Sequence, residues 1–402
     1  GRCREGAYER ALKFAAHRRE HSTDEILLRR EVVDDDPIAD ADPFRDPTEG
    51  QAAESLVERR RQSTGENLGL AVLVTHPRPR VATGPSIVVI TTNLEVPMGA
   101  HEGSDRDDRG GGLTAAAAAD LFRRAPDRFL DVGVGEVAYR KVGTGPDVLF
   151  VHGWPVSGAT FRCLLPYLAD HVTCHVIDLP GAGSSRFTGR TPVSFDNHIR
   201  SVRRVVDLLG LESVVAVGHD SGGLIVRHAL ADDDRLRALV LIDTEQSTGV
   251  SVKFRTFVAG RRIPGFGHAL AWLAGRPRLR RNGLVFGDAF VDRSHLDGEF
   301  AEFFLEPLHG SPDHRRAASR ILRSFGYRYL RGLDELHGRI RVPVHLIWGE
   351  ADRFFPVARA ADMVGSFPDA RLTVIEGAGL FAHEERPAEV AAALLTTVTG
   401  SE

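Results

Sequence analysis

Hydrophobic side chains recur in short runs from residue 127 to the carboxyl end of the chain. Short runs rich in valine, isoleucine and leucine predict strands. Helical patterns, such as those at 198–209 and 224–230, separate most of these strands. The predicted strands span 129–132, 136–142, 148–151, 172–177, 214–217, 238–242, 344–347 and 372–375. Because these runs are almost continuously apolar, both faces of the strands should be buried. The pattern predicts an α/β fold with a mostly parallel eight-stranded sheet flanked by helices.

This alternation stops between residues 246 and 341, where helical periods replace the strands. Residues 300–304 and 316–330 show such periods, with arginines among the apolar side chains. An insertion of this kind should lie over the carboxyl edge of the sheet, where open α/β sheets bind their ligands. We therefore expect a helical cap at 246–341 between two parts of the core, 126–245 and 342–400.

Residues 1–125 lack this regularity. They contain low-complexity pieces, among them the alanine run 115–119, so we expect a disordered or non-native extension. The chain has two methionines, Met98 and Met363, and Met98 is the only upstream candidate for an initiator. We therefore expect residues 1–97 to be dispensable for folding.

The overall composition argues against several functional classes. The 402 residues carry 51 basic and 55 acidic side chains, a formal net charge of −4, which does not suit a nucleic-acid-binding surface. Three cysteines cannot form a fully paired disulfide framework, and no segment is apolar enough to span a membrane. We expect a cytoplasmic protein. His17 and His21 share helical spacing, but with no third ligand nearby they predict a solvated helix and no metal site, and nothing predicts a cofactor.

The strongest chemical signal lies where a predicted strand runs directly into a helix, at Gly218-His219-Asp220-Ser221-Gly222. A side chain at the apex of so sharp a turn projects out of the sheet, and the turn closes only if the residues two before and two after are small. With Asp220 at the apex, those residues are both glycine. With Ser221 at the apex, His219 would stand where a small residue is needed. The spacing therefore favours Asp220 as a nucleophile.

Two further motifs follow predicted strands, His-Gly-Trp-Pro at 152–155 and Asp-Leu-Pro-Gly-Ala-Gly at 178–183. In this order and spacing, the motifs make residues 127–400 resemble the α/β-hydrolase fold. The Gly-His-Asp-x-Gly-Gly sequence resembles its aspartate-nucleophile branch, the epoxide hydrolases and the haloalkane or haloacid dehalogenases. The resemblance implies that the backbone N–H groups of Trp154 and Ser221 form an oxyanion hole.

A carboxylate nucleophile leaves an alkyl ester, which water must cleave with the help of a base and an orienting acid. The resemblance points to Asp352 as the acid, with Asp243 as the alternative. The family's catalytic histidine should stand where this chain has Leu380, and leucine cannot accept a proton. His383, three residues on, is the candidate base if a helical turn brings it into the site. Three other histidines are weaker candidates: His152, His219 and His228.

The substrate is less well defined by sequence. Dehalogenases of this branch often have a tryptophan directly after the nucleophile, where this chain has Ser221. Epoxide hydrolases use two tyrosines of the inserted segment, and this insertion contains only Tyr327 and Tyr329, of which at most one should reach a ligand.

The sequence leaves three hypotheses open. The first is a hydrolase that uses Asp220 and water on a small apolar epoxide, organohalide or ester. The second is a catalytically impaired or non-hydrolytic protein of the same fold that binds a small ligand, because of Leu380. The third is a serine esterase that uses Ser221.

Overall fold

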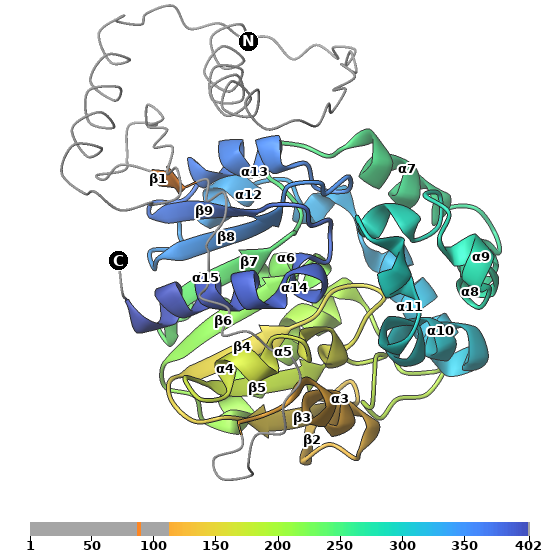
Figure 1. Ribbon diagram of the computed structural model, residues 1–402, viewed down its shortest axis with the longest axis horizontal. Coiled ribbons are helices and arrows are strands. Elements are labelled where there is room, and N and C mark those ends of the chain that lie inside the picture. Colours follow the sequence, from red (N-terminus) through yellow and green to blue (C-terminus); the bar gives the residue numbers. More distant parts are fainter. Residues whose placement is uncertain (1–86, 90–111, 401–402) are drawn as a thin grey trace, which may run out of the picture. The chain divides into compact units, whose positions relative to one another are not determined.

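The computed structural model describes residues 87–89 and 112–400, and the described chain is built around one twisted sheet (Figure 1). The strands are β1 (Ile87–Val89), β2 (Arg128–Asp131), β3 (Glu136–Val142), β4 (Asp147–Val151), β5 (Thr173–Asp178), β6 (Val214–His219), β7 (Leu236–Ile242), β8 (Val344–Gly349) and β9 (Ala370–Ile375). Their order is β1-β9-β8-β7-β6-β4-β5-β3-β2. All neighbours are parallel except β2 with β3 and β3 with β5.

The predicted fold class is confirmed, and all eight predicted strands are present. Every residue of β5, β6 and β8 is buried, as their continuous apolar sequences require. Within the described residues the sheet gains a ninth strand, β1, which pairs parallel to β9. Its three residues lie in the segment that we assigned to the extension.

Helices follow most strands of the core. They are α3 (Ala115–Arg123), α4 (Leu165–Leu168), α5 (Phe195–Leu209), α6 (Ser221–Leu230), α13 (Val357–Val364), α14 (Ala382–Glu385) and α15 (Pro387–Thr399), with the 3₁₀ turn η1 (Gly158–Phe161) after β4. Local sequence sets their ends. In α5 the Ser194 hydroxyl accepts the Asn197 N–H, and Gly210 ends the helix in the left-handed conformation, with φ 64°.

Between β7 and β8 the chain forms a separate group of helices, α7 (Val252–Gly260), α8 (Phe266–Ala274), α9 (Pro277–Arg280), α10 (Glu306–Gly310), α11 (Pro312–Ser324) and α12 (Leu333–His337). Shorter turns join them: η2 (Gly287–Ala289), η3 (Arg293–Leu296), the π-helical η4 (Ala301–Leu305) and η5 (Tyr327–Tyr329). Helices α7 to α11 lie together on one side of the sheet (Figure 1). Whether this segment acts as a cap remains a prediction.

One expected helix ends early. The apolar period at 316–330 predicted one continuous helix, but α11 stops at Ser324. Phe325 and Gly326 have extended backbones, with ψ 138° and 151°, and only a 3₁₀ turn follows them. The apolar period continues because the side chains beyond the helix, such as Phe325 and Tyr329, still pack into the core.

The expected order boundary near residue 125 is also wrong. The alanine run that we counted as low complexity forms α3, whose N-cap Thr114 accepts the Ala117 N–H at 3.2 Å. Ala118, Ala119 and Phe122 of this helix are buried. Their apolar contacts stabilise a helix that composition alone did not reveal. His17, His21 and Met98 lie outside the described residues.

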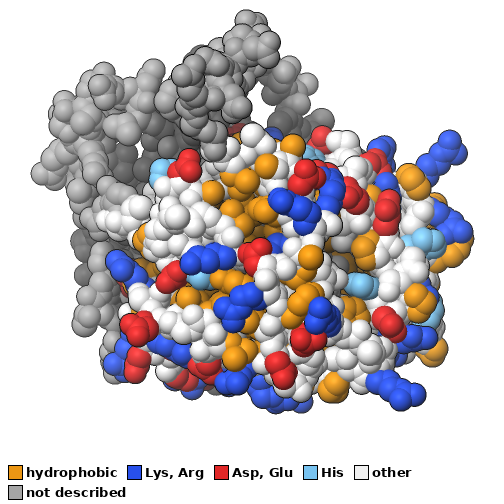
Figure 2. All heavy atoms as spheres, turned by 90° about the horizontal axis from the view of Figure 1, so that it is seen from below, with side chains coloured by type: hydrophobic (Ala, Val, Ile, Leu, Met, Phe, Trp, Pro, Cys, Tyr) orange, Lys and Arg blue, Asp and Glu red, His pale blue; other side chains and the backbone are white. Residues whose placement is uncertain are grey.

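Charged side chains of both signs are present on the surface (Figure 2). On the face seen in Figure 2, basic and acidic side chains are interspersed, and neither sign forms a large separate field. In the part of the chain that the structure describes, no helix has both the length and the apolar character needed to cross a membrane.

Helix α3 should contribute measurably to stability, because Phe122 packs edge-on against Phe303 and under the Arg140 guanidinium. Phe122→Ala should lower the free energy of unfolding by about 3 kcal/mol, the usual cost of removing a buried phenylalanine ring. Urea denaturation measures this change. Ala116→Gln, at an exposed position of the same helix, is the control and should change it little. Equal stability of the two variants would show that α3 does not belong to the cooperative core.

Candidate active site

The turn between β6 and α6 places Asp220 at its apex. Asp220 has a positive φ of 49°, which is rare for a residue with a side chain. A Cβ at Gly218 would lie 2.6 Å from the Cα of Gly223, and one at Gly222 would overlap the carbonyl oxygen of Val151. Both glycines are therefore required by close backbone contacts, as the spacing predicted. The strained apex residue is the aspartate, and Ser221 begins the helix.

The carboxyl group of Asp220 faces two backbone donors. Its Oδ2 accepts the Trp154 N–H at 2.8 Å, and a Ser221 backbone N–H also bonds to the carboxyl. The Ser221 hydroxyl donates to Oδ2 at 3.3 Å. Burial raises the pKa of Asp220 to about 6, and the hydrogen bonds limit that rise. The two N–H groups thus converge on the carboxyl, an arrangement consistent with the predicted oxyanion hole, although their catalytic role stays a prediction.

Asp220 and Ser221 line a pocket of about 710 Å³ between the sheet and the segment 246–341. Its lining is almost entirely apolar or aromatic: Trp154, Pro155, Phe195, Phe254, Phe257, Val258, Val285, Phe286, Ala289, Ile321, Leu322, Phe325, Phe354, Leu380 and Phe381. Among the described residues of this lining, Glu245 is the only polar one besides Asp220 and Ser221. Such a pocket suits a small apolar ligand that meets a few oxygen atoms at one end.

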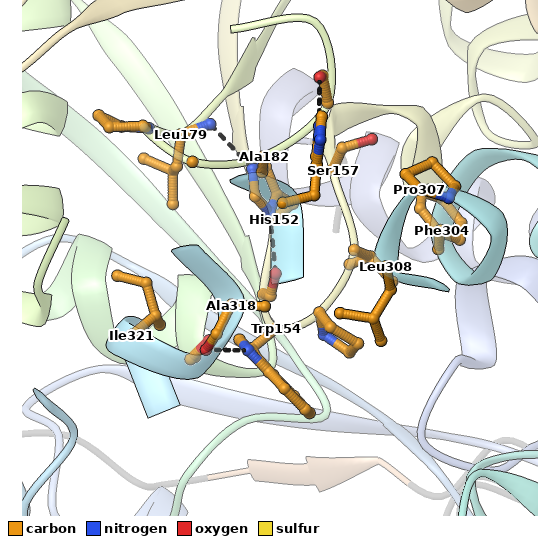
Figure 3. A pocket seen from close by; sticks show the side chains of 18 of the residues that line it. His152, Trp154, Ser157, Leu179, Ala182, Phe304, Pro307, Leu308, Ala318 and Ile321 are labelled. Carbon is orange, nitrogen blue, oxygen red and sulfur yellow. Dashed lines mark hydrogen bonds between the residues drawn. The ribbon is translucent and has the colours of Figure 1, made fainter. Parts of the chain in front are cut away.

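Figure 3 shows a second pocket, of about 580 Å³. The two share Trp154, Pro155, Ser221 and Ile321. The Trp154 indole N–H donates to the carbonyl oxygen of Ala318 at 3.0 Å, which ties the loop after β4 to helix α11 (Figure 3). Trp154 therefore lines both pockets, and its backbone N–H faces Asp220.

The position of the expected base is occupied by Leu380, whose side chain lines the Asp220 pocket. His383 does not replace it, so that prediction is wrong. The His383 ring is fully buried in α14, and its Nε2 bonds the Thr160 hydroxyl at 2.8 Å. It lines neither of the two pockets. The His383 side chain thus points toward η1, which contains Thr160. Burial lowers the pKa of His383 well below its usual value.

The three weaker histidine candidates also lie outside the Asp220 pocket. His152 accepts the Leu179 N–H at its Nε2 and donates from Nδ1 to the carbonyl oxygen of Gly153, so two backbone groups hold it neutral in the wall of the second pocket (Figure 3). His219 donates to the carbonyl oxygen of Leu380 at 2.9 Å, and burial lowers its pKa to about 3. His228 bonds the carbonyl oxygen of Tyr329.

Both candidate acids have one unpaired oxygen. Asp352 Oδ1 accepts the Phe354 and Phe355 N–H groups at 2.7 and 3.1 Å, and Asp243 Oδ1 accepts the Gly349 N–H at 2.7 Å. The Oδ2 atoms of both acids are buried without a hydrogen-bond partner. An imidazole N–H would be a natural donor for either oxygen, and a leucine at 380 has none to offer. The choice between the two acids stays open.

Burial and like charges act on these acids in the same direction. Burial raises the pKa of Asp352 to about 8, and the nearby Asp220 charge adds to the rise. Burial and the Asp352 charge raise the pKa of Asp243 well above its usual value. Two adjacent buried carboxyls without a cation between them are more stable when protonated.

We expected at most one of the two tyrosines of the insertion, Tyr327 and Tyr329, to reach a ligand, and the structure places both outside the Asp220 pocket. Neither is among the residues that line it. The Tyr329 hydroxyl donates to Asp196 at 2.8 Å and accepts from Arg328 at 2.6 Å. Because α11 ends at Ser324, both tyrosines lie on a 3₁₀ turn beyond the helix.

Glu245 is the site residue that our sequence interpretation missed. It follows β7 at the carboxyl edge of the sheet, is only 2% exposed, and lines the pocket beside Asp220. Burial and the charge of Asp220 raise its pKa to about 8, and Arg227 opposes the rise. The sequence signal that could have identified Glu245 is its position three residues after the end of a buried strand. Asp220 likewise follows the end of a neighbouring strand, at the same edge of the sheet.

The chain belongs to the Alpha/beta hydrolase family, whose model matches residues 148–393. Among curated proteins, it is 27% identical over 276 residues to Haloalkane dehalogenase 2 of Mycobacterium bovis, covering 67% of this chain and 93% of that protein. It is 26% identical over 253 residues to the pimeloyl-[acyl-carrier protein] methyl ester esterase of Xanthomonas campestris pv. campestris, covering 62% and 94%.

Solved structures of the same fold are similar at lower identity. The epoxide hydrolase CorEH without ligand matches with a TM-score of 0.57 and 19% identity, over 68% of this chain and 99% of that chain. The putative ancestral haloalkane dehalogenase AncHLD2 matches with a TM-score of 0.59 and 22% identity, over 68% and 98%. These similarities show the fold, and with the family match they define an α/β-hydrolase.

The raised pKa of the buried Asp352 carboxyl should make stability depend on pH. Its folded pKa of about 8 exceeds the usual value, so its contribution to stability is fully present below about pH 4 and is lost as the pH rises toward 8. Asp352→Asn removes this dependence. Its melting temperature relative to the wild type should therefore rise between pH 5 and pH 8 in thermal unfolding experiments.

Asp170→Asn, at an exposed carboxylate, is the matched control and should follow the wild type at both values of pH. A constant difference between Asp352→Asn and the wild type would contradict the raised pKa.

Proposed function

We propose that this chain is a hydrolase that attacks a small apolar electrophile with the carboxylate of Asp220. The observation that carries this proposal is the position of the Asp220 carboxyl, at the apex of the elbow, beside the Trp154 N–H and in an apolar pocket. A carboxylate there can attack a saturated carbon in line and form an alkyl ester. Water then attacks the ester carbonyl, and the N–H groups of Trp154 and Ser221 stabilise the oxyanion that forms.

The apolar lining supports a substrate without charged groups, because burying a charge in such a pocket without a partner is costly. The names of the relatives suggest haloalkanes, epoxides and methyl esters as chemical classes. Ser221 follows Asp220 and offers no indole N–H, and the indole N–H of Trp154 already donates to the carbonyl oxygen of Ala318. A halide leaving group would thus receive little stabilisation from that position.

A serine esterase has less support. The Ser221 hydroxyl lies 3.3 Å from Asp220 Oδ2, and no histidine lines the pocket that holds both residues. A serine nucleophile needs a base that removes its proton, and the neighbouring carboxyl has a pKa of only about 6. The arrangement therefore favours the aspartate.

Intact-protein mass spectrometry tests the nucleophile directly. After incubation with short alkyl bromides or terminal epoxides, the wild type should either turn over substrate or carry one covalent adduct, which peptide mapping places on Asp220. Asp220→Asn should show neither, since an amide is a poor nucleophile, whereas Asp170→Asn should behave as the wild type. Neither turnover nor adduct across the panel would overturn the aspartate mechanism and support a protein that only binds ligands.

Leu380→His tests whether an imidazole can act at this site. The new ring would stand in the Asp220 pocket, and the unpaired Oδ2 of Asp352 or Asp243 could accept its N–H. We expect the ester on Asp220 to be hydrolysed about a hundred-fold faster at pH 7, the usual contribution of a positioned base. Single-turnover decay of the adduct measures this rate. Leu380→Met is the control, and equal decay in both variants would show that residue 380 does not face the ester.

A further inference from the structure

Apart from Asp220, Glu245 is the one titratable side chain among the described residues that line the Asp220 pocket. Three lining residues have a side-chain oxygen, Asp220, Ser221 and Glu245, and no histidine, lysine, arginine or tyrosine is among the lining residues. The glutamate comes from the end of β7, the strand next to β6, which carries Asp220. Apart from the nucleophile, Glu245 is therefore the one group in this lining that can exchange a proton.

The hydrogen bonds around Thr244 indicate which form of Glu245 rests in the pocket. The Thr244 hydroxyl has a single hydrogen, which it donates to the carbonyl oxygen of Asp220 at 2.7 Å, while Arg227 donates to its oxygen at 3.0 Å. Glu245 Oε2 is a second acceptor within reach of the same hydrogen, 3.1 Å from the Thr244 hydroxyl oxygen. The shorter distance assigns the hydrogen to the Asp220 carbonyl oxygen, and with that assignment the contact with Glu245 is a hydrogen bond only if Glu245 carries a proton.

The charges that face Glu245 agree with this arrangement. Burial and the Asp220 charge raise the pKa of Glu245 to about 8, whereas the Arg227 guanidinium and the Thr244 hydroxyl contact lower it. Arg227 also donates to the Glu245 carbonyl oxygen at 2.8 Å. Arg227 further contacts His337 of α12 at 3.1 Å, whose pKa burial and Arg227 hold well below the usual value. The pKa of Asp220 is about 6. Near pH 7 the pocket thus holds an ionised aspartate and a protonated glutamate.

We propose that Glu245 carries out the proton transfers of this site, first as the acid on the leaving oxygen and then as the base for water. This inference rests on the proposed function of Asp220. It assigns to one glutamate the work that the family resemblance would divide between two tyrosines and a histidine, none of which lies in this pocket.

With an epoxide, the first step is balanced by one proton. An Asp220 oxygen bonds to an epoxide carbon, the carbon–oxygen bond of the ring breaks, and its electron pair goes to the ring oxygen. That oxygen takes the proton of Glu245. The products are a hydroxyalkyl ester on Asp220 and an ionised Glu245.

In the second step, Glu245 removes a proton from water as the water oxygen bonds to the ester carbonyl carbon. The N–H groups of Trp154 and Ser221 stabilise the resulting oxyanion. When it collapses, the ester carbon–oxygen bond breaks, and the leaving alkoxide takes the remaining proton of the attacking water. A diol leaves, and both carboxyl groups return to their starting states.

This order of events predicts a substrate preference. Esterification removes the Asp220 charge that raises the Glu245 pKa, so the glutamate is a more stable anion in the ester. An epoxide also takes the glutamate proton and leaves the base ready. An alkyl bromide takes no proton, so the ester that it forms should persist until the pH is high enough to ionise Glu245.

The test compares 1,2-epoxyhexane with 1-bromohexane on the full chain. For the epoxide, Glu245→Gln should slow formation of the ester by about a hundred-fold or more, since a positioned general acid contributes at least that much. For the bromide, the same variant should form the ester at the rate of the wild type and retain it. Glu245→Asp should restore part of both activities.

The controls separate this inference from the proposed function. Glu212→Gln removes an exposed carboxylate and should leave every rate unchanged. The kcat/KM for the epoxide should rise with the ionisation of Asp220 near pH 6 and fall near pH 8, and the fall should disappear in Glu245→Gln. Turnover of the epoxide by Glu245→Gln at the rate of the wild type would overturn the role of Glu245 while leaving Asp220 as the nucleophile.

A measurement without substrate keeps the inference falsifiable if no probe reacts. Infrared difference spectra at pH 7 should contain a protonated carboxylic-acid band that Glu245→Gln removes and Glu212→Gln retains. If the wild type shows neither turnover nor an adduct, the proposed function is contradicted. If the carboxylic-acid band is absent, the protonated state of Glu245 is contradicted.

Discussion

The close approach of three backbone segments at the elbow is the constraint on which the site depends. A side-chain carbon at Gly222 would overlap the carbonyl oxygen of Val151, and one at Gly153 would overlap the Asp220 carboxyl. The glycines therefore let β4, β6 and α6 meet closely enough for the Trp154 N–H to reach Asp220 at 2.8 Å. The strained backbone of Asp220 persists because the buried sheet on both sides leaves it no alternative.

The absence of an imidazole at residue 380 changes the electrostatics of the whole site. Asp352 and Asp243 each retain a buried oxygen without a donor, and no cation separates them. Glu245 adds a further acid, whose pKa the Asp220 charge raises. Such a cluster lowers its free energy by holding protons. The carboxyl groups around Asp220 therefore hold protons at higher pH than ordinary carboxyl groups do.

The features that could be predicted from the sequence depend on interactions between residues close together in the chain. The strands were predictable because buried parallel strands need continuous apolar runs, and the elbow because backbone contacts over a few residues demand glycine at 218 and 222. The direction of His383 depended on how α14 packs against η1, more than two hundred residues away in sequence. The positions of Tyr327 and Tyr329 depended on where α11 ends. The stability of α3 depended on Phe122, which packs against Phe303 of the insertion.

The sequence by itself thus determined the fold class, the apex aspartate and the missing histidine, since each depends on residue type and near spacing. Only the tertiary structure decided which side chains share the pocket. Glu245 had no local signature of its own, because its burial and its raised pKa arise from Asp220 and the surrounding apolar side chains, brought together by neighbouring strands of the sheet. Proton affinity is a property of that assembled environment.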